Sequence, residues 1–213
     1  MNTDQLIAAL ATGVEPVDPM ALRRRLGIAT ALGIVAALPL MLALLGLNPG
    51  LAQAAQLPMF WVKFAFVAGL ALAGGWAVAR LSRPGAALQL PALALALPEL
   101  VMAVLALLAL ALARADQRLV LLLGSSWSAC PWLIVVLSLP SFALLLWAVK
   151  GLAPTRLRLA GAGAGLLAGA IGALVYVLHC PELAAPFLLV WYTLGMLLPA
   201  AAGALVGPRL LRW

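Results

Sequence analysis

The stretch PWLIVVLSLPSFALLLWAV, residues 131–149, decides the fold of this chain. It contains no charged side chain, and Lys150 follows its last residue. An α-helix needs about 20 apolar residues to cross the hydrocarbon core of a bilayer. Barrel strands would instead appear as shorter segments of alternating polarity. The stretch therefore predicts a membrane-spanning helix, and the chain contains further runs of the same kind.

The composition of the whole chain points to the same class of protein. Of the 213 residues, 66% are hydrophobic and 9% are charged. A soluble domain of this size cannot hide so much apolar surface. The net charge of +7 would suggest a nucleic-acid partner in a soluble chain. In a membrane protein it has a simpler cause, because Lys and Arg gather on cytoplasmic loops.

We expect an all-α integral membrane protein with six transmembrane helices in three hairpins. The expected spans cover residues 27–46, 58–80, 91–113, 131–149, 158–178 and 185–207. Glycines at four-residue spacing in the fifth span predict close packing between helices. These glycines are Gly161, Gly165 and Gly169.

The basic residues predict how the chain is oriented. Ten Lys and Arg residues flank the spans on one side, and two, Arg114 and Arg118, lie on the loops of the other side. The rule that positive charges stay inside places both termini in the cytoplasm. The sequence thus divides into a cytoplasmic tail, residues 1–22, and a six-helix transmembrane domain, residues 23–213.

The tail has an ordinary and a functional interpretation. Asp4 could cap a short amphipathic helix that places Leu6, Ile7 and Leu10 on one face. The ordinary interpretation is a frayed terminus. The functional one is a docking peptide that folds onto a partner through its apolar face.

Cys130 and Cys180 are the two thiols of the chain, and a proline follows each of them at the expected outer start of a span. Proline suits the first helical position, so each cysteine would be an N-cap residue. A helix N-terminus lowers the pKa of a thiol, which then oxidises more readily and binds soft metals better. The pair could be a structural disulfide, two idle thiols, or a sensor that responds to oxidation or to capture of a transient soft metal ion, which His179 could join as a third ligand.

Two ionisable residues fall inside expected spans, where such residues are usually functional. Lys63 lies near the outer end of the second span, so its stem could carry the ammonium to the interface. Glu99 lies deeper in the third span beside Pro98. It could be protonated, or hydrogen-bonded where the proline interrupts the helix.

The residue inventory argues against an enzyme and against a resident cofactor. We find no nucleotide-binding loop, no metalloprotease motif and no Ser–His–Asp set, since His179 is the single histidine. Two alternatives stay open. A membrane thiol oxidoreductase that passes electrons to a quinone would need a second redox pair. A soft-metal transporter would need polar residues along its helices, and these are scarce.

Three motifs together resemble one family, the NrsF-like (DUF1109) membrane anti-sigma factors. They are LIAAL at 6–10 with Pro16-Val17, SSWSACPW at 125–132, and HCPE at 179–182. The resemblance covers nearly the whole chain. It implies a multi-pass protein of the bacterial inner membrane that holds an extracytoplasmic-function (ECF) sigma factor on the cytoplasmic side, without binding nucleic acid itself. Heavy-metal or oxidant stress would release the sigma factor.

The resemblance also implies roles for particular residues. Cys130 and Cys180 would be the periplasmic sensor pair. The sigma-binding surface would include tail residues Asp4, Leu6, Ile7, Leu10 and Val17. Because a tail this short buries little area, the inner loops 81–90 and 150–158 could share the contact.

Overall fold

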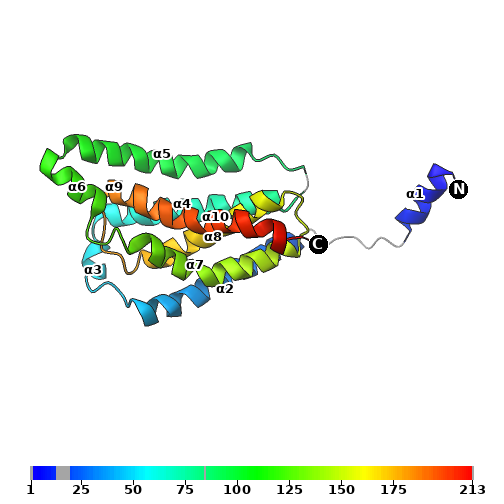
Figure 1. The fold of residues 1–213 in the computed structure, drawn as a ribbon, viewed down its shortest axis with the longest axis horizontal. Coiled ribbons are helices and arrows are strands. Elements are labelled where there is room, and N and C mark those ends of the chain that lie inside the picture. The colour runs from blue at the N-terminus through cyan, green and yellow to red at the C-terminus, as the bar shows by residue number, and fades with distance from the viewer. Residues whose placement is uncertain (1, 13–19, 84, 213) are drawn as a thin grey trace.

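The computed structural model describes residues 2–12, 20–83 and 85–212, and all regular elements in these ranges are helical (Figure 1). In chain order they are α1 (Thr3–Ala11), α2 (Ala21–Leu44), α3 (Leu51–Ala54), α4 (Pro58–Leu81), α5 (Gln89–Leu112), α6 (Ala115–Leu123), α7 (Cys130–Lys150), α8 (Leu157–Tyr176), α9 (Ala185–Phe187), the π-helical turn η1 (Leu188–Tyr192) and α10 (Thr193–Leu210).

Six helices in the described ranges are long and apolar enough to cross a membrane: α2, α4, α5, α7, α8 and the continuous helix Ala185–Leu210. The predicted fold class is therefore confirmed. Prolines help to set the starts of these helices, because the first turn needs no proline N–H. Pro58 begins α4, and Pro131 and Pro186 lie in the first turns of α7 and α9.

The bundle is organised around α8. Its largest interfaces join it to α10, α7 and α4, whereas α2 and α4, which are neighbours in the chain, touch at few positions. Of the spanning segment of α8, 78% is buried, against 11% for α5. The third expected hairpin, α8 with α10, is therefore the largest interface of the bundle, whereas the first, α2 with α4, is scarcely packed. The cytoplasmic position of the termini stays a prediction.

Glycines allow this close packing, as their spacing predicted. A Cβ atom at Gly161 would collide with the carbonyl group of Gly203, and one at Gly165 with that of Pro199. Because these atoms belong to the backbone of α10, only a residue without a side chain permits the observed approach.

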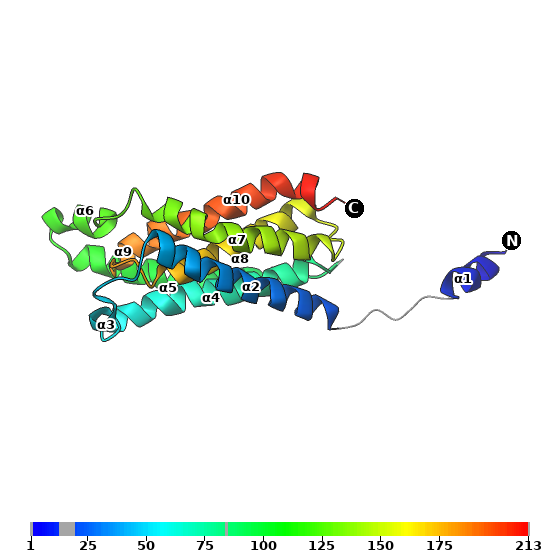
Figure 2. The ribbon, with the colours of Figure 1, turned by 90° about the horizontal axis from the view of Figure 1, so that it is seen from below.

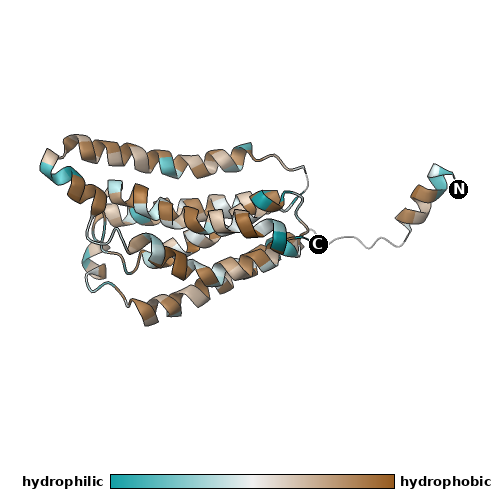
Figure 3. Ribbon diagram, in the orientation of Figure 1, coloured by the Kyte–Doolittle hydropathy of each residue, from teal (hydrophilic) through white to brown (hydrophobic). Residues whose placement is uncertain are grey.

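The outer helices of the bundle consist mainly of hydrophobic residues, as Figure 3 shows most plainly along α2 and α5. Exposed leucines follow the length of α5, including Leu93, Leu97, Leu100 and Leu107. A surface of this kind suits contact with lipid.

One end of the bundle collects the segments that carry both cysteines. In Figures 1 and 2, α3, α6 and α9 lie together at the end opposite the C-terminus. The start of α7 and the loop 177–184 belong to the same end, and their buried side chains share one hydrophobic cluster.

Candidate functional site

The two thiols lie in one buried cluster. Cys130 is fully buried and Cys180 is 3% exposed, and both are free thiols that belong to the same hydrophobic core. Their side chains lie close enough to interact directly. Residues 50 positions apart in the chain, from different loops, thus form a single site.

The prediction that both cysteines cap helices is wrong. Cys130 is the first residue of α7, and Ala129 is the N-cap. Cys180 extends the last turn before the loop, where its N–H donates to the carbonyl of Tyr176 at 3.0 Å. The next helix begins only at Ala185, because Pro186 rather than Pro181 takes the first helical turn.

The expectation that Lys63 reaches the membrane interface is also wrong. Its side chain is fully buried, and its Nζ donates to the carbonyl oxygens of Cys180 at 2.8 Å and Glu182 at 3.1 Å. The ammonium also lies 5.1 Å from the centre of the Tyr192 ring, within reach of a cation–π interaction. These partners inside the bundle replace water, so the ammonium turns inward. A lysine in a span at the expected depth of Cys180 was the sequence signal for this contact.

Glu182 ties the two cysteine loops together. One of its carboxylate oxygens accepts hydrogen bonds from the backbone N–H of Ser125 at 2.7 Å and from the Ser125 hydroxyl at 2.6 Å. The adjoining Gly124 has φ +55°, and a Cβ atom there would lie 2.8 Å from atoms of Glu182 and Phe187. The HCPE motif is therefore hydrogen-bonded to the SSWSACPW motif, through Glu182 of the first and Ser125 of the second.

His179 contacts the loop after α2. Its Nδ1 lies 3.1 Å from the carbonyl oxygen of Gly46, and its ring is 5.7 Å from the ring of Tyr176. Asn48 donates its N–H to the carbonyl of Leu178 at 3.1 Å, so the loop after α2 packs on this turn. Within the described ranges, no three His, Cys, Asp or Glu side chains gather as metal ligands. The structure does not bring His179 and the cysteines into a three-ligand arrangement.

The surroundings of Cys180 make its thiol acidic. The hydrogen bond from the Cys130 thiol and, next, the nearby Lys63 ammonium lower the pKa of Cys180 to about 5, although burial opposes this shift. An acidic thiol beside a second thiol is suited to oxidation to a disulfide. This cause differs from the helix N-terminus that the sequence suggested.

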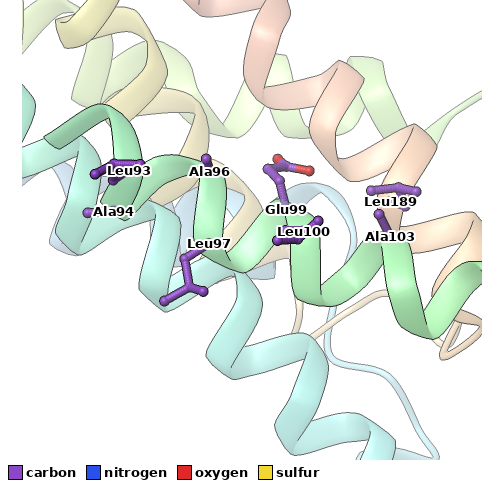
Figure 4. Close-up of a pocket in the computed structure, with 8 residues that line it drawn as sticks. All are labelled: Leu93, Ala94, Ala96, Leu97, Glu99, Leu100, Ala103 and Leu189. Atoms are coloured by element: carbon purple, nitrogen blue, oxygen red, sulfur yellow. The ribbon is translucent and has the colours of Figure 1, made fainter. Parts of the chain in front are cut away.

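Glu99 belongs to a separate place on the bundle. It lines an apolar groove of about 750 Å³ between α5 and the start of the last span (Figure 4). Both of its carboxyl oxygens lie 3.1 Å from the Thr193 hydroxyl, which donates to them. Lys63 has its own partners in the cysteine loop, so the two intramembrane ionisable residues serve different contacts.

The described part of the N-terminal tail is the amphipathic helix α1. Asn2, rather than Asp4 as expected, caps it: the Asn2 side chain accepts from the Asp4 N–H at 3.3 Å, and the Gln5 side chain accepts from the Asn2 N–H at 3.2 Å. This reciprocal pair is a capping box, and Asn2 three residues before Gln5 was its signal. Leu6, Ile7 and Leu10 are 42%, 60% and 70% exposed. Val17 lies outside the described residues.

The fold and the site define a multi-pass helical membrane protein whose two thiols lie together in one buried cluster. The chain belongs to the NrsF family, negative regulators of sigma F, which it matches over residues 10–213. The "Probable anti-sigma-F factor NrsF" of Azospira oryzae is 50% identical over 213 residues, covering 100% of both chains. The "Anti-sigma-F factor NrsF" of Caulobacter vibrioides is 45% identical over 218 residues, again covering 100% of both. No solved structure matches. The resemblance drawn from the motifs is confirmed, and the role of the family is regulatory rather than enzymatic.

Proposed function

We propose that this chain is an anti-sigma factor of the bacterial inner membrane. It holds an ECF sigma factor on the cytoplasmic side and releases it when the two thiols react. The observation that carries the proposal is the full-length similarity to two proteins named as anti-sigma-F factors. Such a regulator needs a sensing part and a docking part, and we assign these to the buried thiol pair and to the exposed apolar face of α1.

The docking part is α1. A helix that exposes leucine and isoleucine side chains along one face can bury them in a groove of a partner. A helix of 9 residues offers limited area, so a second contact is expected. The opposite end of the bundle from the thiols has a groove of about 670 Å³ with Arg158, Arg209 and Arg212 in its lining. Its positive charge fits an acidic surface on the sigma factor.

The sensing part is the thiol pair. Cys130 begins α7, Cys180 follows α8, and Lys63 of α4 bonds to the Cys180 loop. A covalent change at the sulfur atoms therefore acts on three helices that pack together. Release of the sigma factor requires that this change favours a second packing of the bundle, which binds the partner less well.

The geometry favours oxidation over metal capture as the trigger. Two adjacent thiols suffice for a disulfide, whereas a soft metal ion that takes three or four ligands would need further side chains that the described residues do not bring together. The quinone-linked oxidoreductase has no second thiol pair for relaying electrons, because the chain contains two cysteines in all.

Capture of the partner tests the docking part. The full-length chain, in detergent or nanodiscs, is expected to co-purify with an ECF sigma factor of the same bacterium. Leu10→Asp should abolish capture, because it places a charge on the apolar face of α1. Ala8→Asp is the matched control, since helical periodicity places Ala8 on the other face. If both variants capture equally well, α1 is not the docking element.

A reporter driven by the sigma factor tests the sensing part. A hydroperoxide should induce it in cells with the native chain and leave it uninduced with Cys130→Ser or Cys180→Ser. Induction by a soft metal such as cadmium, with no response to hydroperoxide, would identify metal capture as the trigger instead. Full induction of both cysteine variants would exclude the thiol pair as the sensor.

A further inference from the structure

We propose that Lys63 assigns unequal roles to the two cysteines: it holds Cys180 as the attacking thiolate and leaves Cys130 as the thiol that resolves the intermediate. This assignment rests on the proposed sensing function and deepens it. Lys63 would act as a positioning residue, because it bonds to the backbone of Cys180 and acts on the reaction through the charge of that thiol.

The burial of Lys63 is the first step of the argument. An ammonium group without water is costly unless it faces hydrogen-bond acceptors and a negative charge. The two carbonyl oxygens that accept from Lys63 are neutral, so they satisfy its N–H groups but not its charge. The carboxylate of Glu182 is already engaged by Ser125. Of the groups that can carry a negative charge near the ammonium, the thiol pair acts on it more strongly than the Glu182 carboxylate does.

The position of the ammonium distinguishes the two sulfur atoms. Lys63 bonds to the backbone carbonyl of Cys180 itself, which ties the charge to the residue that bears this thiol. The backbone of Cys130 is engaged elsewhere, since its N–H donates to Ser126 at 2.9 Å in the turn before α7. The groups that face the pair from the other elements are the phenols of Tyr176 in α8 and Tyr192 in η1.

The lowered pKa of the Cys180 thiol, about 5, agrees with this geometry. At neutral pH the pair would hold one proton, shared through the hydrogen bond between the two side chains. Lys63 on the Cys180 side biases the negative charge toward that sulfur.

The oxidant in the proposed chemistry is a hydroperoxide. The Cys180 thiolate attacks its terminal oxygen, so an S–O bond forms and the O–O bond breaks. The alkoxide that leaves takes a proton from water, and Cys180 becomes a sulfenic acid. The Cys130 sulfur then loses its proton and attacks Cys180. An S–S bond forms, the S–O bond breaks, and hydroxide leaves with that proton as water. The two thiols supply two electrons, and the hydroperoxide becomes an alcohol.

Oxidation also changes the electrostatic balance of the site. A disulfide is neutral, so the buried ammonium of Lys63 loses the thiolate beside it while it stays bonded to the 180–182 loop. The arrangement that was favourable around a thiolate becomes unfavourable around a disulfide. Movement of this loop and of α4 would relieve the cost, which gives the thiol reaction a route to the packing of the bundle.

The test is the pH dependence of thiol alkylation in the purified full-length chain. The reduced protein in nanodiscs is treated with N-ethylmaleimide at pH 5 to 10, and mass spectrometry reports the rate at each cysteine. We expect Cys180 to react first, with a midpoint below about pH 6.5. In Lys63→Met the midpoint should move toward the ordinary thiol range near 8.5, and Lys63→Arg should restore most of the shift. The midpoint is the readout because intrinsic nucleophilicity falls with the pKa, so the rate at one pH changes little.

A second variant separates charge from simple loosening of the loop. Ser125→Ala removes one hydrogen bond to the same loop and changes no charge, so it should leave the alkylation midpoint in place. An unchanged midpoint in Lys63→Met, or first reaction at Cys130 in the native chain, would overturn the assignment. If the alkylation midpoint shifts as much in Ser125→Ala as in Lys63→Met, the role of Lys63 is structural only. The alkylation midpoint and the order in which the cysteines react are measured without a sigma factor. A failed capture experiment would therefore reject the proposed function, whereas the alkylation experiment alone decides the role of Lys63.

Discussion

Replacing Gly161 by alanine tests the contact between α8 and α10, on which the bundle depends. A Cβ atom at this position would overlap the Gly203 carbonyl oxygen, and it would lie 2.9 Å from the Gly203 carbonyl carbon and 3.0 Å from the Gly207 Cα. These are backbone atoms of a facing helix, which cannot rotate out of the way as a side chain can. The two helices must separate locally to admit the methyl group.

The size of the effect follows from two opposing contributions. Alanine in place of glycine favours the helix itself by at most about 1 kcal/mol. Overpacking of a close contact costs about 1–3 kcal/mol, and more where backbone must shift. Gly75 of α4 provides the matched control, because an added Cβ there meets nothing within 4 Å. We expect Gly161→Ala to lose up to about 2 kcal/mol after the helix gain is subtracted, whereas Gly75→Ala should keep that gain and be stabilised by up to about 1 kcal/mol.

The assay is reversible unfolding of the full-length chain in mixed micelles, followed by circular dichroism as the fraction of denaturing detergent rises. Gly203→Ala introduces the same clash from the α10 side, so the double variant should lose less than the sum of the two single losses. Equal stability of Gly161→Ala and Gly75→Ala would show that α8 and α10 do not approach this closely in the membrane protein.

Three further predictions concern the polar contacts. Glu182→Gln should lower stability by about 1 kcal/mol in thermal unfolding, because Ser125 loses a charged acceptor; an unchanged melting temperature would mean that this contact does not hold the cysteine loops. Because the pKa of Cys180 is lowered from 9.0 to about 5, the free energy of unfolding should rise between pH 5 and pH 9. Cys180→Ser should flatten this pH dependence. Glu99→Gln keeps a hydrogen-bond partner for Thr193 and should change stability by less than about 0.5 kcal/mol; a large loss would show that the bundle needs a charged carboxylate there.

Much of the fold could be predicted because membrane insertion is a local property of sequence. A run of about 20 apolar residues must form its hydrogen bonds within itself, so span existence and approximate bounds follow without knowledge of the neighbours. The glycine spacing in α8 likewise predicted a close contact with another helix, but it did not identify that helix as α10. The motifs around Cys130 and Cys180 were sufficient for the family, since they are read directly from the chain.

The tertiary structure alone decided which polar groups meet. Sequence could not tell that Cys130 and Cys180 come together, because that depends on α7 and α8 packing side by side. For the same reason Lys63 was expected at the interface: whether a long side chain turns outward or inward depends on the acceptors that distant segments offer. The loop carbonyls at residues 180 and 182 supply those acceptors, 117 and 119 positions from Lys63. Hydrophobic length is encoded locally, whereas the partner of a buried charge is set by long-range packing.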